Sequence, residues 1–279
     1  MAFESKDLDI IVDLLSDSDP DIVSRMRRKL YELGSETVEQ ILSSVGSENP
    51  AHREASRVMR WLKAPKPEAA LQSLLDDAVE DVDLETGLCA LAKSTYPEIE
   101  RHRIAEHLDR LAADVAASIN PADHPVRIVR TLNTFLFDDL SFRGKQDYDR
   151  DPDPDLSYIN RVLDRRTGIP ISLSSIYLLL AWRLDLPIVG VDMPMYFILR
   201  FDHEHPFYID PFHQGRILTA NECGEMIGKP VDESTLPVAS NLRILIRTTG
   251  NLFRTYTALG DKNRAESMKT YIDLLQGAT

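Results

Sequence analysis

The sequence contains few cysteines and lacks a long apolar run. Cys89 and Cys223 lie far apart and outside any CxxC motif, which excludes a zinc or disulfide framework and favours a reducing compartment. The longest apolar run, residues 176–182, is followed by Arg183 and is far shorter than the roughly 20 residues that cross a bilayer. The first ten residues show no secretory signal pattern. We therefore expect a soluble, cytoplasmic protein that does not bind membranes.

Positive charge is also scarce. The chain has 32 Lys and Arg residues against 45 Asp and Glu residues, giving a formal net charge of −13 at pH 7. Such a surface repels phosphate groups, so neither nucleic acid nor an anionic membrane is an expected partner. With 279 residues, of which 43% are hydrophobic, the chain is long enough to bury a large core in one large domain or in two to three small ones.

Residues 1–64 predict four short amphipathic helices. Stretches such as DLDIIVDLLSD repeat apolar residues at helical spacing. Asp19-Pro20 and Asn49-Pro50 each place a capping side chain before a proline, which is typical of a first helical turn. Paired helices that begin with a capping residue followed by proline resemble HEAT repeats. A plain helical bundle fits the same pattern, because there is room for only two repeat units.

A proline-rich joint over residues 63–70 leads into a second helical region. Helices are expected over residues 67–79, 84–95, 97–118 and 125–138. A polar loop of about 16 residues follows, and a loop that long inside a compact region is often functional. Ser157 is placed to cap the helix that comes next.

The remaining third of the chain mixes helix and strand. An almost wholly apolar helix is expected over residues 170–184, buried nearly all round and with Trp182 in the core. Residues 187–193, 195–201 and 207–212 read as short strands. Thr219 and Glu222 form a capping box, and two further helices meet at residues 260–261 in a TPR-like hairpin. The fold class is therefore α+β, mainly α.

Two stretches resemble the SirB-type transglutaminase-like family. They are YINRVLDRRTGIPISLSSIYLLLAWRLDLPIVGVDMPMYFILR and YIDPFHQGRILTANEC, and the resemblance covers roughly residues 70–260. It implies a papain/transglutaminase-like core, in which a helix carrying a nucleophile packs on an antiparallel sheet that supplies a base and an orienting acid. The expected organisation is a HEAT-like region (1–64), a SirB-type helical region (65–140), the transglutaminase-like core (141–238) and the TPR-like hairpin (239–279).

The resemblance also implies that the catalytic triad is incomplete. Active transglutaminase-like enzymes begin the helix with a cysteine, but residues 168–174 contain none. The histidine that opens the next strand is replaced by Tyr196, and only the acid is matched, by Asp210. We expect Asp210 to accept hydrogen bonds at the turn before Pro211. The leading prediction is a noncatalytic interaction or regulatory protein, a pseudoenzyme with a protein or peptide partner.

The alternative is a serine-dependent hydrolase or acyl transferase that uses the same cleft. Ser172 or Ser174 would be the nucleophile, and His213 is the one plausible relocated base, because Tyr196 has an ordinary pKa of about 10. Serine also suits the first turn of a helix without any catalytic role. In either case we expect the turn 170–174 to reach the surface, at the floor of a small groove.

Alternating acidic residues in the long polar loop are a further candidate site. They are Asp147, Asp149, Asp151, Asp153 and Asp155. The pattern resembles a calcium loop but lacks that loop's glycine at position six and glutamate at position twelve. A solvated acidic loop is favoured, and we expect neither a metal nor a cofactor.

Overall fold

The computed structural model describes residues 5–63, 67–231 and 236–278. The chain divides into two compact units, residues 1–66 with 93–98 and residues 67–92 with 99–279. The expected joint at 63–70 lies partly outside the described residues. The finer expected boundaries at residues 140 and 238 stay a prediction.

The first unit consists mainly of four helices, as expected. They are α1 (Ser5–Leu15), α2 (Pro20–Leu33), α3 (Ser35–Ser44) and α4 (Pro50–Leu62). The Asp19 carboxylate accepts the Asp21 amide at 2.8 Å, and the Asn49 side chain accepts the Ala51 amide at 2.8 Å, so both predicted caps form. All four helices contribute to one apolar cluster, which includes Leu15, Leu30, Ile41 and Val58. The HEAT-like repeat stays a prediction.

The second unit contains the remaining helices. They are α5 (Pro67–Asp76), α6 (Leu84–Lys93), α7 (Arg101–Ala116), α8 (Pro125–Asn133), α9 (Ile159–Arg165), α10 (Pro170–Arg183), α11 (Ala220–Ile227), α12 (Asn241–Ala258) and α13 (Lys262–Gln276). The expected helix 125–138 changes geometry after Asn133, where a π-helix runs from Thr134 to Asp139. Such segments are rare and often mark functional sites.

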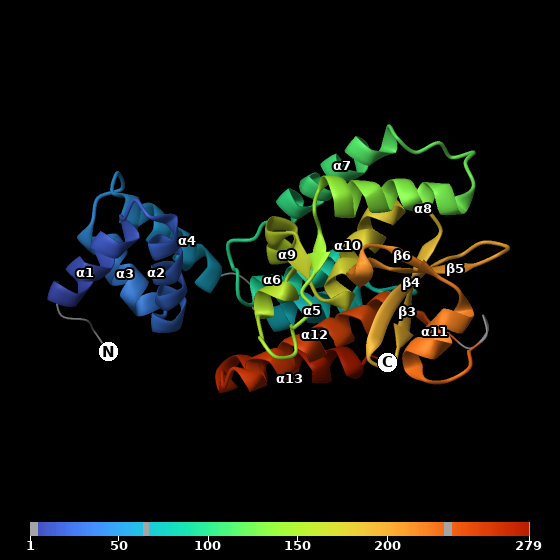
Figure 1. The fold of residues 1–279 in the computed structure, drawn as a ribbon. Coiled ribbons are helices and arrows are strands. Elements are labelled where there is room, and N and C mark those ends of the chain that lie inside the picture. Colours follow the sequence, from blue (N-terminus) through green and yellow to red (C-terminus); the bar gives the residue numbers. More distant parts are fainter. Residues whose placement is uncertain (1–4, 64–66, 232–235, 279) are drawn as a thin grey trace. The chain divides into compact units, whose positions relative to one another are not determined.

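A five-stranded antiparallel sheet forms the β part of this unit. In the order β6-β5-β4-β3-β7 its strands are Arg216–Leu218, Phe207–Asp210, Tyr196–Phe201, Ile188–Met193 and Val238–Ala239. The sequence predicted the three longest. Figure 1 shows the sheet beside α10. Because β4 and β5 are antiparallel, Tyr196 and Asp210 lie at one end of the sheet, opposite the hairpin with His203 and His205. The mainly helical α+β class is confirmed.

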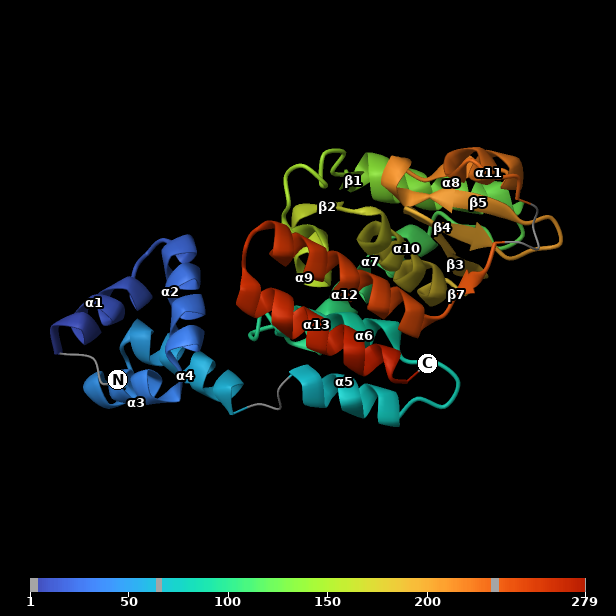
Figure 2. The same cartoon turned by 90° about the horizontal axis from the view of Figure 1, so that it is seen from below.

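Helix α10 lies at the centre of the unit. It packs against β3 and β4 on one side and against α7, α9 and α12 on the others (Figures 1 and 2). Every residue from Ile171 to Ala181 is buried, as its apolar composition predicted. Trp182 differs from the expectation: it is 37% exposed, and its indole nitrogen donates to the Ile188 carbonyl at 2.9 Å.

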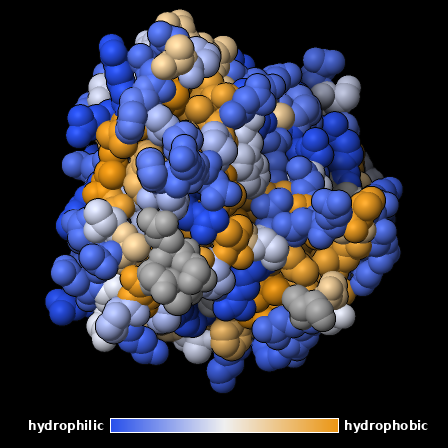
Figure 3. Space-filling view, turned by 90° about the vertical axis from the view of Figure 1, so that its right-hand side faces the viewer, coloured by the Kyte–Doolittle hydropathy of each residue, from blue (hydrophilic) through white to orange (hydrophobic). Residues whose placement is uncertain are grey.

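The other face of the sheet carries α11. Val191, Ile198 and Tyr208 from the strands form a buried cluster with Cys223 of the helix. The predicted capping box opens α11, since the Glu222 amide donates to the Thr219 hydroxyl at 3.3 Å and Glu222 accepts the Thr219 amide at 2.8 Å. Figure 3 looks onto this side of the molecule and shows apolar side chains in separate patches among hydrophilic ones.

The C-terminal helices α12 and α13 form an antiparallel hairpin at the predicted turn, where Gly260 adopts a φ of 73°. Helix α13 packs on α5, and α12 packs on α10. The hairpin is thus integrated into the second unit. Among the described residues, no helix is long and apolar enough to cross a membrane.

Replacing Leu179 tests the central position of α10. This side chain is 3% exposed, and a cavity in its place should lower the free energy of unfolding by about 2–5 kcal/mol. Leu259→Ala is the matched control, because Leu259 is 50% exposed and should change stability by less than about 1 kcal/mol. Urea denaturation measures both. Equal effects would show that α10 is not the core.

Candidate functional site

The first turn of α10 is where a transglutaminase-like enzyme would carry its nucleophile. Pro170 occupies the first helical position, where its missing N–H costs nothing. Contrary to expectation the turn is not on the surface: Ser172 is 5% exposed and Ser174 0%. The physical reason is that the loop before α9 and the end of the sheet cover it, at Leu156 and Phe197 respectively.

The serine hydroxyls of this turn are bound to the backbone. Ser172 accepts the Ile169 amide at 3.0 Å and donates to the Leu156 carbonyl at 2.6 Å. Ser175 donates to the Ile171 carbonyl at 2.8 Å, while Ser174 lies 3.5 Å from the Phe197 carbonyl. In the described part of the chain, no hydrogen bond joins Ser172 or Ser174 to a histidine or tyrosine. These hydroxyls therefore satisfy buried polar groups of the backbone.

Tyr196 opens β4, where the enzymes carry histidine. Its side chain is half-buried and packs against the apolar cluster under α11. Arg247 of α12 holds the preceding turn, donating to the Met193 carbonyl at 2.9 Å and pairing with Asp192. In that turn Met195 has a φ of 65° and is 82% exposed. Left-handed backbone favours glycine, so an exposed methionine here is strained.

Asp210 and His213 do come together. Asp210 closes β5 and is 4% exposed. One of its oxygens accepts the Phe212 and His213 amides, at 3.1 and 3.3 Å. The other lies 2.6 Å from the His213 Nδ1, and the imidazole is half exposed. Asp210 therefore orients a histidine three residues later in the chain, because the short helix Pro211–His213 turns that side chain back.

The turn after His213 is tied to α8 and α10. Gly215, with a φ of 71°, donates to the Asp210 carbonyl at 2.9 Å, and its own carbonyl accepts the Asn133 side chain at 2.7 Å. The Tyr177 hydroxyl donates to Asn133 at 3.0 Å. A Cβ on Gly215 would lie 2.2 Å from the Asn133 side chain. The sequence did not single out Asn133, which the structure places next to the π-helix Thr134–Asp139.

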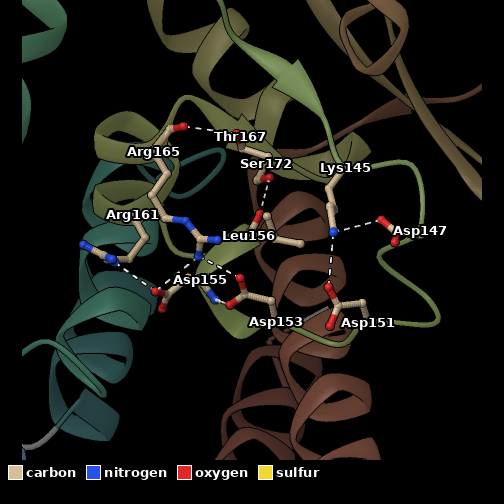
Figure 4. Close-up of polar contacts among 10 residues, drawn as sticks. All are labelled: Lys145, Asp147, Asp151, Asp153, Asp155, Leu156, Arg161, Arg165, Thr167 and Ser172. Carbon is tan, nitrogen blue, oxygen red and sulfur yellow. Dashed lines mark hydrogen bonds and ion pairs between the residues drawn. The ribbon is translucent and has the colours of Figure 1, made fainter. Parts of the chain in front are cut away.

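The acidic loop is held by cations from this chain, as Figure 4 shows. Lys145 bridges Asp147 and Asp151 at 3.0 and 3.1 Å, and Arg165 pairs with Asp153 at 2.7 Å. The hydrogen bond to Asp147 raises the pKa of Lys145, and the same bond lowers the pKa of Asp147. Within the described ranges no group of three or more His, Cys, Asp or Glu residues is arranged to hold a metal ion.

A cavity of about 160 Å³ lies between this loop and α12. It is lined by Ile169 at the start of α10, but by none of Ser172, Ser174, Tyr196, Asp210 and His213. Its wall includes Tyr148, whose ring meets Phe212 edge-on at 5.8 Å between centroids. Burial, followed by the Asp149 carboxylate, raises the pKa of Tyr148. The cavity is thus next to the His213 turn, not on the serines where a groove was expected.

Neither cysteine replaces the missing thiol. Cys89 is 2% exposed and Cys223 is fully buried. Burial raises the pKa of the Cys223 thiol to about 12, with contributions from the Glu222 and Asp210 carboxylates. A thiol protonated in this way is a poor nucleophile.

The buried carboxylate of Asp210 should stabilise the turn that closes β5. Asp210→Ala removes the acceptor for two amides and one imidazole, so the free energy of unfolding should fall by about 1–3 kcal/mol in urea denaturation. Asp202→Ala is the control, because that carboxylate is mostly exposed and should change stability by less than about 1 kcal/mol. Equal stability of the two variants would contradict a structural role for Asp210.

Met195→Gly should stabilise the protein by about 0.5–1 kcal/mol. Relief of the left-handed strain exceeds the extra entropy that glycine gives the unfolded chain. Met195→Ala keeps a Cβ and removes the exposed side chain, so it should leave the melting temperature almost unchanged. If alanine and glycine act alike, the effect comes from the side chain and not from the backbone.

Comparison with known proteins agrees with this architecture. The family model described as the transglutaminase-like superfamily matches residues 102–250. F-box only protein 21 of Mus musculus is 33% identical over 161 residues, which cover 53% of this chain and 25% of that protein. A UPF0162 protein of Xylella fastidiosa is 29% identical over 201 residues, covering 67% of this chain and 69% of its own.

Protein SirB1 of Salmonella typhimurium is 24% identical over 210 residues, which cover 75% of this chain and 71% of that protein. The chain therefore spans only about a quarter of F-box only protein 21, and more than two thirds of the bacterial relatives named here. No solved structure matches. The chain belongs to the transglutaminase-like superfamily, together with SirB1 and the UPF0162 proteins.

Proposed function

We propose that this chain is a noncatalytic interaction or regulatory protein that binds a protein or peptide partner through a transglutaminase-like fold. The observation that carries the proposal is the Ser172 hydroxyl, which lies 2.6 Å from a backbone carbonyl and is 5% exposed. With no cysteine in the first turn, and with its serines engaged in structure, the helix has no group ready to attack a substrate.

The relatives support a binding module. In F-box only protein 21 the matching region makes up 25% of the chain, so this fold occurs as one part of a longer protein. A fold can keep its shape after losing its reaction, because the site and the scaffold are separable.

The His213–Asp210 pair favours a second candidate, a serine-dependent hydrolase or acyl transferase. A histidine whose Nδ1 is held by a buried carboxylate leaves its Nε2 to accept a proton, as a general base must. For this reaction a serine of the first turn must exchange its backbone hydrogen bond for one to His213. The energetic cost of that exchange is the loss of a buried hydrogen bond, about 1–3 kcal/mol.

Serine replacement combined with covalent labelling distinguishes the two candidates. Ser172→Ala should lower the free energy of unfolding by about 1–3 kcal/mol. Ser174→Ala should have a smaller effect, because its hydrogen bond is long and weak. A fluorophosphonate probe, read by mass spectrometry, should label none of the serines, and the wild type and Ser174→Ala should capture the same partner from the source lysate.

His213→Ala is the matched variant for the catalytic candidate, since it removes the base and leaves Asp210 its two backbone donors. Stoichiometric labelling of Ser172 or Ser174 that disappears in His213→Ala would overturn the proposal in favour of the hydrolase. Labelling that survives in His213→Ala would show a reactive serine without this base, and would also contradict a noncatalytic protein.

A further inference from the structure

The cavity beside the acidic loop has the size of a small ligand. Its volume of about 160 Å³ is space for roughly eleven to sixteen water molecules, at about 10–15 Å³ of such volume for each. That corresponds to a ligand of about ten non-hydrogen atoms. One wall is the loop before α9, and the other is the face of α12 that carries Asn251, Arg254 and Thr255.

The wall formed by the loop is held by ion pairs within the chain. Besides the pairs of Lys145 and Arg165, Arg161 binds Asp155 at 3.0 Å (Figure 4). The strand β1 (Arg143–Gly144) pairs with β2 (Thr167–Gly168) and closes the base of the loop. A preformed site loses less entropy on binding than a loop that must be ordered first.

Ser157 is a buried polar residue in this cavity. It is 4% exposed and lines the cavity, yet its hydroxyl makes no hydrogen bond to another described residue. The sequence predicted that Ser157 caps α9, but this is wrong: the cap position is Tyr158, and no side chain bonds to the helix end there. Buried hydroxyls in native proteins nearly always have a partner, so this one is available to bond to a molecule in the cavity, whether water or a ligand.

Two exposed side chains of opposite charge, Asp149 and Arg254, also line the cavity. Asp149 makes no hydrogen bond or ion pair, and Arg254 bonds only to Asn251, in the part of the chain that is described. Asp153, which also lines the cavity, is already neutralised by Arg165. A simple anion would be repelled by Asp149 and a simple cation by Arg254, so the site suits a molecule with one charge of each sign.

We propose that this cavity binds a small zwitterion of amino-acid size, with its carboxylate at Arg254 and Ser157, its ammonium group at Asp149 and its apolar part on Leu156 and Ile169. Guanidinium binds carboxylate with two parallel hydrogen bonds, which gives orientation as well as affinity. The same chemistry is offered by a free α-amino acid and by a dipeptide. This site does not depend on the proposed partner binding.

Calorimetry and thermal shift on the full chain test the proposal with free amino acids and with dipeptides. At least one should bind and raise the melting temperature, because a ligand specific to the native state stabilises it. Its N-acetyl and C-amide derivatives, which each lack one charge, should bind at least tenfold more weakly. If only free amino acids bind, or only dipeptides bind, the result supports the site and shows which of the two classes supplies the ligand.

Three variants assign the groups. Arg254→Gln and Asp149→Asn should each raise the Kd about ten- to a hundredfold, and Ser157→Ala about three- to tenfold. The first two variants lose a hydrogen bond to a charged group, and the third loses one to a neutral group. Arg150→Gln and Asp138→Asn are matched controls, because these exposed residues do not line the cavity and should leave the Kd unchanged.

The proposal fails if no amino acid or dipeptide binds at millimolar concentration, or if the blocked derivatives bind equally well. It also fails if the control variants weaken binding as much as Arg254→Gln. None of these results bears on the serine labelling or partner capture, so the two proposals stand or fall separately.

Discussion

Helix α10 has no polar face, and the rest of the second unit is arranged around that constraint. A helix whose residues are buried from Ile171 to Ala181 must be covered on every side, because exposing it would cost the burial energy of a whole core. The sheet covers one side, while α7, α9 and α12 cover the others. The acidic loop and the turn after β5 then pack on the ends of these elements, so the location of both candidate sites follows from the burial of one helix.

The same burial explains why the serines in the first turn of α10 are bonded to the backbone. A hydroxyl in a dry environment must find a partner, and for Ser172 the nearest partners are the Ile169 amide and the Leu156 carbonyl. The Asp210–His213 pair lies at the end of β5, where His213 is half exposed and Asp210 holds its Nδ1. In this position the pair also closes β5, since Asp210 accepts the amides of the following turn.

Local chemistry made much of the fold predictable. Three features could be predicted because each is set by residues close together in the sequence. They are the Asp19 cap, the Thr219–Glu222 capping box and the apolar composition of α10. Strands β6 and β7 were missed because segments of two or three residues are specified by their tertiary partners and not by a pattern.

The candidate site was only partly predictable. His213 could be nominated because it follows Asp210 by three residues, but its 2.6 Å contact depends on the short helix at Pro211. The local sequence around Ser157 is compatible with a helix cap and with a position in a cavity wall. Only the packing of α12 decides between the two roles. The apolar composition of α10 predicted its burial. The composition could not show that the loop before α9 covers the first turn of the helix.

Trp182 provides an optical signal for the second unit. The sequence contains two tryptophans: Trp61 belongs to α4 of the first unit, and Trp182 is the last residue but one of α10 in the second. Because Trp182 is 37% exposed and bonded to the Ile188 carbonyl at 2.9 Å, its emission depends on the contact between α10 and β3. Replacing the tryptophan at position 61 by phenylalanine leaves Trp182 as the only indole of the sequence, so the fluorescence of that variant follows the second unit alone.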